Sequence, residues 1–551
     1  MSVNHRAPIA NGPQPSKSGS PNQSAQRRAW SGNPFVAVVT VGIIAISTAI
    51  FVPVANAQSA PAKTTATNAT GANEITINVD LQAPSHPFPH FWEEMFGSGR
   101  AALSLRESYR DDLREVQKAT NFEFIRFHGI FLDELGLYDE DKDGNPIYNF
   151  SYIDQIYDSL LKNHVRPFVE LSFMPNKLTS DPKKIQAFWY KPNVAPPKDW
   201  EKWDKLVEVF TRHLVDRYGE DEVALWYFEV WNEPNLDFWA GEPRESTYYQ
   251  LYDHAAQAIK RVSRRLRVGG PATAQAAWAD RFLAHCHANN IPVDFVSTHV
   301  YGNDKAEDVF ATHEIIPRDK MVCRAVEKVH QQILSSPYPK MPLIWSEFNA
   351  DYSNQPQVTD SAYMGPWMAD TIRQCDGLTA MMSYWDFSDV FEEQGVVKEP
   401  FYGGFGLLAE DGIPKPSFNA FLLLHELGDQ RLDVQTDSAL VTRRKNGSVR
   451  IAVWGKIVPP EQQATATDTV QLKFAGIGKA HDARVTIIDD EHGSPLPDYE
   501  EMGRPRSPTQ PQIAQLRAAA ALPHANSVPI IDNTLKLTLP PHALALIEIE
   551  P

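Results

Sequence analysis

Cysteine is scarce in this chain of 551 residues, which contains only Cys286, Cys323 and Cys375. At most one disulfide can form, so the chain is not a disulfide scaffold. The tripeptide His285-Cys286-His287 has residue types that bind metals, but it lies in a helix-like segment, where adjacent side chains point in different directions. We interpret it as structural, and we predict no metal and no cofactor.

Basic residues are too few for a protein that binds nucleic acid. The chain has 52 lysines and arginines against 69 aspartates and glutamates, a net charge of −17. Residues 1–57 hold four of the basic residues and no acid, so the rest of the chain carries 48 basic against 69 acidic residues, a net charge of −21. A nucleic-acid partner would require a basic surface.

The string Gly403-Gly404-Phe405-Gly406 lacks the spacing and the Lys-Ser/Thr pair of a phosphate loop, so it predicts a tight turn and no nucleotide site.

An apolar run from Phe35 to Val54 follows a polar, positively charged leader. Ala55-Asn56-Ala57 then fits the small-residue cleavage pattern of an export signal. We predict that residues 1–57 are a signal peptide, that residues 58–73 are a flexible linker rich in Ala, Thr and Asn, and that the protein is periplasmic or secreted. The alternative is an uncleaved membrane anchor at residues 35–54, since about twenty apolar residues can span a bilayer.

Short apolar runs alternate with amphipathic stretches over residues 91–425, which is typical of β/α units around a parallel sheet. Asp199 can cap a helix between the third and fourth runs, and Gly219 can end it. Eight runs predict the eight strands of a closed (β/α)8 TIM barrel. They lie at residues 91–97, 122–128, 165–173, 225–231, 266–270, 293–301, 342–348 and 378–387.

The pattern changes to strand-like alternation after about residue 426, which predicts an additional C-terminal β-sandwich domain over residues 426–551. Asn446-Gly447 is a two-residue hairpin signal within this region. Residues 74–90 begin with an alternating strand that we expect to join the sandwich, whereas the Pro- and Ala-rich residues 497–525 predict irregular structure. The fold class is therefore α/β, a TIM barrel with a β-sandwich.

Two glutamates stand where apolar strand runs stop. One lies in Trp231-Asn232-Glu233-Pro234-Asn235 at the end of the fourth strand, and the other in Ile344-Trp345-Ser346-Glu347-Phe348 at the end of the seventh. Active groups of TIM barrels lie at the C-terminal ends of the strands, so both side chains are expected to converge over one mouth of the barrel. The hydrolysis of a glycosidic bond requires two facing carboxyls. The alternative is that the two glutamates form ion pairs on the surface and have no catalytic role.

The neighbours of each glutamate suggest its role. Asn232 is suited to donating a hydrogen bond to a sugar 2-hydroxyl, and Pro234 fixes the backbone after Glu233. We predict that Glu233 is the general acid/base, with its pKa raised by the charge of Glu347, and that Glu347 is the nucleophile of a retaining double displacement. A wider separation of the carboxyls would instead leave room for water and invert the product.

Other polar and aromatic residues at strand ends are candidate sugar contacts, although each alone could equally be packed core. Tyr301 could orient the nucleophile, and Trp385 could form a floor against the sugar ring. The predicted substrate-binding residues are His128, Asn232, His299, Tyr301, Trp385, Glu392 and Glu393.

The chain closely resembles glycoside hydrolase family 39, and within it the bacterial β-xylosidases. The similar motifs run from about Phe96 to the end of the chain. They include Phe96-Gly97-Ser98-Gly99-Arg100, Tyr148-Asn149-Phe150-Ser151-Tyr152, Phe228-Glu229-Val230-Trp231-Asn232-Glu233-Pro234-Asn235-Leu236, Ser383-Tyr384-Trp385-Asp386-Phe387 and Met502-Gly503-Arg504-Pro505-Arg506.

The resemblance implies a retaining exo-glycosidase that removes β-1,4-linked xylose from the non-reducing ends of xylo-oligosaccharides. It implies the same roles for Glu233 and Glu347, the sugar contacts named above, no metal, and often a homotetramer. The N-terminal export signal is not part of the family's intracellular pattern. Ser346 also departs from the family, in which we expect Thr before the second glutamate.

Two rival functions are compatible with these residues. The first is the same fold acting on another glycoside, as an α-L-iduronidase-like or exopolysaccharide-cleaving enzyme. Such an iduronidase must bind a carboxylate, and Arg126, on the same strand face as His128, is the basic residue that could do so. The second rival is a non-catalytic carbohydrate-binding protein, which has no use for two unpaired carboxyls in one pocket.

Overall fold

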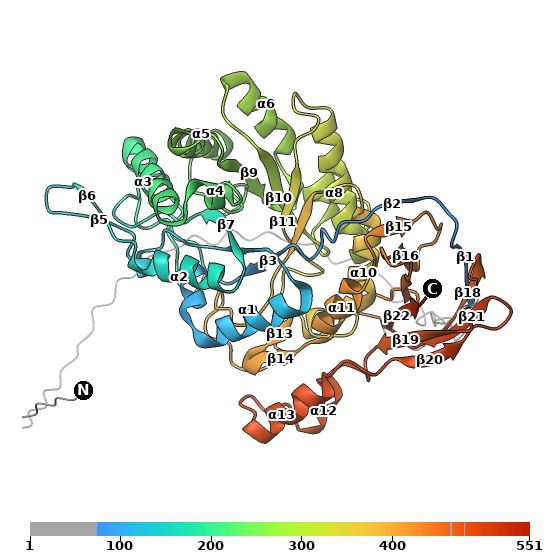
Figure 1. Cartoon of the computed structure of the whole chain (residues 1–551). Coiled ribbons are helices and arrows are strands. Elements are labelled where there is room, and N and C mark those ends of the chain that lie inside the picture. The colour runs from blue at the N-terminus through green and yellow to red at the C-terminus, as the bar shows by residue number, and fades with distance from the viewer. Residues whose placement is uncertain (1–73, 463–465, 479) are drawn as a thin grey trace, which may run out of the picture. The chain divides into compact units, whose positions relative to one another are not determined.

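The computed structural model describes residues 74–462, 466–478 and 480–551. Its centre is a closed barrel of eight parallel strands, in which the last strand pairs with the first (Figure 1). The predicted TIM barrel is therefore confirmed, with each strand overlapping one of the eight expected runs. The strands in ring order are β3 (Met95–Ser98), β4 (Phe124–Phe127), β7 (Arg166–Leu171), β8 (Tyr227–Val230), β9 (Arg267–Thr273), β10 (Phe295–Tyr301), β11 (Leu343–Asn349) and β12 (Met381–Tyr384).

Helices surround this barrel and follow most of its strands (Figure 1). The longer ones are α1 (Glu107–Thr120), α2 (Ser151–Lys162), α3 (Trp200–Tyr218), α5 (Arg244–Val262), α6 (Ala279–Asn289), α8 (Arg318–Leu334), α10 (Met364–Cys375) and α11 (Pro416–His425). Shorter helices are α4 (Glu220–Val223), α7 (Ala306–Phe310) and α9 (Pro356–Thr359). Short β-hairpins also leave the barrel in pairs, β5 (Tyr138–Glu140) with β6 (Pro146–Tyr148) and β13 (Leu408–Ala409) with β14 (Ile413–Pro414).

Helix α3 begins and ends where the sequence predicts. The Asp199 side chain accepts hydrogen bonds from the backbone N–H groups of Glu201 and Lys202. Gly219 follows the last turn with a φ of +86°, a value that favours glycine. Trp203 and Phe210 are among the side chains that the helix buries against the barrel.

The barrel interior changes character along its axis. At the N-terminal ends of the strands, six buried side chains form an apolar layer: Met95, Phe124, Phe168, Phe295, Ile344 and Met381. Two residues further along β4 and β7 lie Arg126 and Glu170, which point to the same side of their strands because side chains alternate. The interior therefore becomes charged toward the C-terminal ends, where the two glutamates lie.

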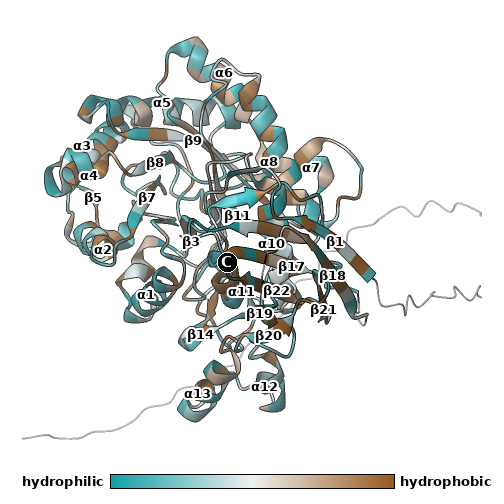
Figure 2. Cartoon of the chain, turned by 45° about the vertical axis from the view of Figure 1, so that its right-hand side comes forward, coloured by the Kyte–Doolittle hydropathy of each residue, from teal (hydrophilic) through white to brown (hydrophobic). Residues whose placement is uncertain are grey.

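The C-terminal region contains two sheets that share one apolar core, as expected for a β-sandwich. One sheet has the order β2-β15-β16-β17-β22-β19-β20, and its strands around β17 and β22 are brown in Figure 2, the colour of hydrophobic residues. The other has the order β1-β18-β21, with the N-terminal strand β1 (Glu74–Asp80) parallel to β18. The remaining bounds are β2 (Ser85–Pro87), β15 (Gln430–Leu432), β16 (Ala439–Arg443), β17 (Val449–Trp454), β18 (Asp468–Ala475), β19 (Asp482–Ile488), β20 (Asn526–Pro529), β21 (Thr534–Leu539) and β22 (Leu544–Ile549).

The predicted hairpin at Asn446-Gly447 is confirmed: residues 444–448 connect β16 to β17, because the register pairs Arg443 with Val449. Another local prediction for this region is wrong. Residues 497–525 are not irregular, since they overlap α12 (Leu496–Glu501) and contain α13 (Gln510–Ala519). Thr509 caps α13 through a reciprocal capping box with Gln512, a signal that the high Pro and Ala content obscured.

The cysteines form one disulfide, between Cys323 of α8 and Cys375 of α10. Cys286 is a free, buried thiol, consistent with a structural role for its tripeptide. Within the part of the chain that the structure describes, we find no helix long and apolar enough to cross a membrane. The predicted signal peptide, linker and alternative anchor lie outside the described residues.

Candidate active site

The two glutamates meet over the C-terminal mouth of the barrel. Glu233 follows β8, the fourth strand of the ring, and Glu347 lies on β11, the seventh. A carboxylate oxygen of Glu233 lies within 4.8 Å of one from Glu347. The two residues are 8% and 5% exposed, so both carboxyls are largely removed from bulk water.

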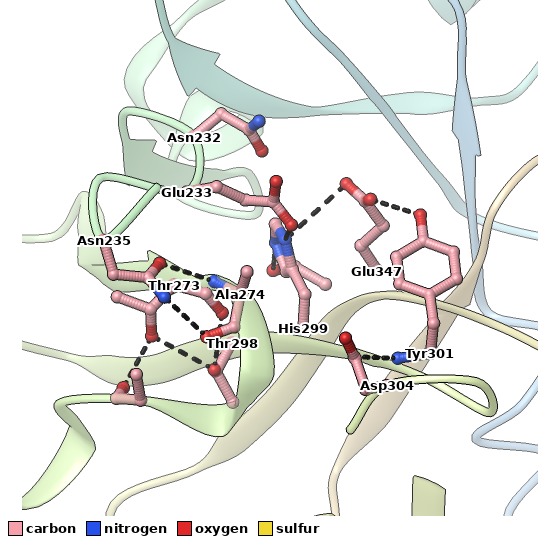
Figure 3. Close-up of polar contacts among 12 residues, drawn as sticks. Asn232, Glu233, Asn235, Thr273, Ala274, Thr298, His299, Tyr301, Asp304 and Glu347 are labelled. Carbon is pink, nitrogen blue, oxygen red and sulfur yellow. Dashed lines mark hydrogen bonds and ion pairs between the residues drawn. The ribbon is translucent and has the colours of Figure 1, made fainter. Parts of the chain in front are cut away.

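His299 of β10 lies between the two carboxyls (Figure 3). Its Nδ1 is 3.1 Å from Glu233 Oε1 and 3.7 Å from Glu347 Oε2, and its Nε2 is 3.1 Å from the Ser346 hydroxyl. Burial, together with the charge of Arg126 and of His128, lowers the pKa of His299 well below its ordinary value. The imidazole is therefore neutral and can position Glu233 without adding a third charge.

The backbone that carries Glu233 adopts an unusual conformation. Trp231 and Glu233 have φ values of +74° and +43°, in the left-handed region that side chains rarely adopt. The Glu233 N–H donates to the Ala272 carbonyl, and the Asn235 side chain exchanges two hydrogen bonds with the backbone of Ala274 (Figure 3). These contacts with the segment after β9 hold the strained turn, and with it the Glu233 carboxyl.

Arg126 forms the floor beneath Glu347. Its guanidinium is fully buried and contacts Glu170 at 2.8 Å, Glu229 at 2.7 Å and Glu347 at 3.0 Å. Its Nη2 also donates to Asn232 Oδ1 at 2.9 Å, which leaves the Asn232 amide N–H groups to serve as donors in the cavity. All three guanidinium nitrogens of Arg126 thus bond protein groups, so Arg126 is already engaged by three carboxylates and the Asn232 amide.

Tyr301 completes the surroundings of Glu347. Its hydroxyl donates a hydrogen bond to Glu347 Oε1, and its backbone N–H donates to Asp304 Oδ2 at 2.8 Å (Figure 3). Burial and the charge of Glu347 raise the pKa of Tyr301 well above its ordinary value, so the phenol remains a donor.

The pKa values of both glutamates are raised, but the groups around Glu347 oppose the shift more than those around Glu233 do. Burial, then the charges of Glu347 and Asp304, raise the pKa of Glu233 well above its ordinary value. Burial also raises the pKa of Glu347, but Arg126, His128 and the Tyr301 hydroxyl all act to lower it. The pair therefore favours a protonated Glu233 beside an ionised Glu347, which is the state needed for one proton donor and one nucleophile.

A cavity of 330 Å³ opens above this pair. Five carboxyl groups line it, from Glu233, Glu347, Glu393, Asp304 and Asp308. Apart from the histidines, the basic residue in the described lining is Lys305, whose side chain is exposed. Six aromatic residues also line it: Phe188, Phe238, Tyr301, Tyr352, Trp385 and Phe405. This combination of carboxyls and aromatic faces suits a neutral polyhydroxylated ligand.

Most of the predicted sugar contacts line this cavity. His128, Asn232, His299, Tyr301, Trp385 and Glu393 are all among its lining residues. Trp385 follows β12 and packs closely over Gly97 of β3, where a Cβ atom would lie 2.2 Å from the indole. His128 Nδ1 is 2.8 Å from Glu170, and its Nε2 is 3.6 Å from Glu393.

Glu392 is the exception. It is not among the residues that line the cavity, and its two carboxylate oxygens bind Arg100 at 2.8 Å and Arg106 at 2.7 Å. Arg100 also bonds Glu134 and lies over the rings of Trp189 and Tyr190. A sugar contact by Glu392 therefore stays a prediction: in this structure its carboxylate is held by the two arginines, and the neighbouring Glu393 is the one that lines the cavity.

Several site residues were missed in the sequence analysis. Glu170 and Glu229 are acids inside otherwise apolar strand runs, and such a charge in a buried strand is itself a signal of an inward-facing ionic partner. Asp304 and Lys305 follow β10, Asp308 lies in α7, and Tyr352 follows β11, and no local pattern in the sequence distinguishes these four residues.

Two groups of side chains in the described part of the chain have ligand atoms close enough to share a metal ion. One comprises Glu233, His299 and Glu347, and the other His90, Glu93 and His425. An ion in the first group would occupy both carboxyls, and the acid and nucleophile chemistry described above would then be lost.

The fold and this pair of buried acids define a class of protein: a TIM-barrel glycoside hydrolase. The model for "Glycosyl hydrolases family 39" matches residues 75–533. The chain belongs to glycoside hydrolase family 39.

Its relatives agree with this assignment. A β-xylosidase of Geobacillus stearothermophilus is 37% identical over 476 residues, which cover 84% of this chain and 93% of that protein. The crystal structure of a monomeric β-xylosidase from Caulobacter crescentus CB15 superposes with a TM-score of 0.78 at 32% identity, over 87% of this chain and 99% of that one. An α-L-iduronidase of Canis lupus familiaris matches more narrowly, at 29% identity over 169 residues, 28% of this chain and 24% of that protein.

Proposed function

We propose that this glycoside hydrolase is a retaining exo-β-xylosidase, with Glu233 as the general acid/base and Glu347 as the nucleophile. The observation that carries the proposal is the closeness of the two carboxyls, since one carboxylate oxygen of Glu233 lies within 4.8 Å of one of Glu347. Retaining enzymes hold their carboxyl groups about 5–5.5 Å apart, whereas inverting enzymes keep about 6.5–9.5 Å to admit a water molecule.

In the first step, Glu347 attacks the anomeric carbon while Glu233 gives its proton to the departing glycosidic oxygen. The glycosidic C–O bond breaks, and a covalent glycosyl ester of Glu347 forms. In the second step, Glu233, now ionised, removes a proton from water, the water oxygen bonds to the anomeric carbon, and Glu347 leaves as a carboxylate. Asn232, held by Arg126, is oriented to donate to the sugar hydroxyl next to the anomeric carbon.

The charge of the cavity supports a neutral sugar over a uronic acid. Arg126, the residue that an iduronidase-like function would need, is engaged by three carboxylates and an amide. The ionised carboxylates of the lining, Glu347 among them, would repel an anionic substrate. The relatives named above and a second β-xylosidase support the same choice, because the proteins that align over most of this chain are named β-xylosidases.

A panel of aryl glycosides tests this proposal. We expect kcat/KM for an aryl β-D-xyloside to exceed that for the matching α-L-arabinoside, β-D-glucoside and α-L-iduronide, and xylobiose to yield β-xylose as the first-formed anomer by NMR. Hydrolysis of the iduronide as the best substrate would overturn the assignment of the sugar. Release of α-xylose first would overturn the retaining mechanism, and no turnover of any glycoside would favour a non-catalytic carbohydrate-binding protein.

We also propose that the protein is exported, to the periplasm or beyond. The Cys323–Cys375 disulfide supports this location, because disulfides persist in oxidising compartments. Fractionation of the source cells, with N-terminal sequencing of the product, tests it: cleavage after Ala57 is expected, and a cytoplasmic full-length chain would contradict it.

Subunit number is a separate prediction. The resemblance suggests a tetramer but the Caulobacter relative is described as monomeric, and light scattering of the purified protein decides between them.

A further inference from the structure

A second constellation of ligating side chains lies at the other end of the barrel from the two glutamates. His90 and Glu93 precede β3, the first strand, and His425 is the last residue of α11. His90 Nδ1 is 2.5 Å and His425 Nδ1 is 2.9 Å from the same oxygen, Glu93 Oε1. The three atoms lie within 4.8 Å of one another.

Imidazole nitrogen and carboxylate oxygen are ligands that Zn²⁺ accepts, and two histidines with one glutamate are a known zinc ligand set. The zinc–ligand distances of about 2.0–2.2 Å require only a small opening of the observed contacts. The side chains of His90 and His425 are 24% and 37% exposed, so an ion can enter and a water molecule can complete the coordination.

The carboxylate of Glu93 gives an independent indication of a ligand. Its side chain is 4% exposed, yet its second oxygen, Oε2, is buried and has no hydrogen-bond partner among the described residues. A buried acceptor of this kind normally has a partner, because an unpaired one loses its hydration without compensation. A metal ion held by Glu93 would compensate this carboxylate directly.

The charges around the three residues also favour a cation. Glu94 interacts electrostatically with both Glu93 and Glu123, and all three carry the same charge. The basic group that acts on His425 from nearby is Arg444, which bonds Glu426. Glu123 is paired with Arg166 and Glu426 with Arg444, so among the described residues Glu93 and Glu94 are the carboxylates of this group that form no ion pair with a lysine or an arginine.

We propose that His90, Glu93 and His425 bind one divalent transition-metal ion, with Zn²⁺ as the best fit, and that this ion is structural. Glu93 and His425 are 332 residues apart in the chain. One residue precedes the first strand of the barrel and the other ends the helix that leads into the sandwich. An ion between them would fasten the beginning of the barrel to its end, at the barrel face that generally serves stability and not catalysis.

Thermal unfolding of the full chain, without an affinity tag and after treatment with EDTA, tests the proposal. Zn²⁺ is expected to raise the Tm by about 2 °C or more at saturation and to bind with a stoichiometry of one per chain by calorimetry. Both effects are expected to disappear in the double variant His90→Ala/His425→Ala. In Glu93→Gln, which keeps the size of the side chain, binding should weaken at least tenfold.

A matched control is His285→Ala. His285 also pairs with a carboxylate, Asp253, at 2.9 Å, but it has no third ligand, so the response of this variant to Zn²⁺ should equal that of the wild type. Co²⁺ provides a second readout, because its visible absorption reports coordination by protein ligands and should be lost in the same variants.

Binding at Glu233, His299 and Glu347 is distinguished by activity. Zinc held there would inhibit turnover, and that inhibition would persist in the double variant, whereas the stabilising site leaves activity unchanged. The proposal is overturned if none of Zn²⁺, Ni²⁺ and Co²⁺ changes the Tm, or if the stabilisation persists without His90 and His425. Should the double variant fail to fold, Glu93→Gln alone decides between a metal site and a cluster in which His90 and His425 only hydrogen-bond Glu93. The outcome does not depend on which glycoside the enzyme hydrolyses.

Discussion

Arg126 and Glu347 form a buried ion pair of 3.0 Å although 221 residues separate them in the chain. The Arg126 guanidinium also contacts Glu170, Glu229 and Asn232, so its position fixes the carboxylate of Glu347 and the amide of Asn232 together. This arrangement uses the planar fork of arginine, in which several donors lie in fixed directions.

Arg126→Lys should therefore impair the enzyme although it keeps the charge. An ammonium is a point charge on a flexible stem and cannot contact all four partners at once, so Glu347 and Asn232 lose their fixed positions. We expect kcat for an aryl β-xyloside to fall on the order of 10²-fold, with a smaller change in KM. Steady-state kinetics on a variant shown to be folded by circular dichroism checks this, and wild-type kcat would contradict the positioning role.

Glu347→Ala removes the proposed nucleophile. Turnover of an aryl β-xyloside should fall by more than ~10⁴-fold, because no covalent intermediate can form. Azide fits the space left by the carboxylate and should restore part of the activity, giving the α-xylosyl azide. Chromatography of the products identifies it. Glu393→Ala serves as the control, since it also deletes a cavity carboxyl and should show no azide rescue.

Glu233→Ala removes the proposed proton donor. Substrates with poor leaving groups should slow much more than dinitrophenyl xyloside, whose departure needs no protonation. Burial and Glu347 raise the pKa of Glu233, and activity requires its protonated form, so the wild-type rate should decline as pH rises through that pKa. This alkaline limb should vanish in the variant with the activated substrate. Equal slowing of both substrates would argue against the role.

Tyr301→Phe deletes the hydrogen bond that acts to lower the pKa of Glu347. The pKa of Glu347 should rise, and since the ionised form is the nucleophile, the acidic limb of the kcat/KM profile should move to higher pH. We expect kcat to fall about 10–100-fold. Tyr352→Phe is the matched control, because Tyr352 lines the same cavity without a recorded bond to Glu347. An unmoved acidic limb in Tyr301→Phe would show that the hydroxyl does not tune Glu347.

Lys415→Ala should destabilise the fold. The Lys415 ammonium is fully buried between Asp360 at 2.7 Å and Asp389 at 2.6 Å, and it donates to the Gly404 carbonyl. Its removal leaves two buried acids without their cation, which costs about 3–5 kcal/mol of unfolding free energy. Arg324→Ala breaks an exposed pair with Glu314 and should leave the urea midpoint almost unchanged. Similar midpoints for the two variants would refute the argument from burial.

The barrel strands and both glutamates could be predicted because their signals are local. Each strand is a short apolar run, and Glu233 and Glu347 end two such runs. The ion pairs of Glu392 could not be predicted in this way. Glu392 and Glu393 are adjacent in the sequence, and only the pairing of β12 with β3 in the closed barrel brings Arg100 and Arg106, which follow β3, into contact with Glu392.

The sequence alone determined the barrel, the sandwich and the two acids at strand ends. Neighbouring residues are enough to show hydrophobic periodicity and the ends of strands. The tertiary structure decided three things: which cysteines pair, which acid is protonated, and which histidines lie around Glu93. Desolvation and Coulomb interactions act through space over a few ångströms, and folding brings together groups that lie hundreds of positions apart in the chain.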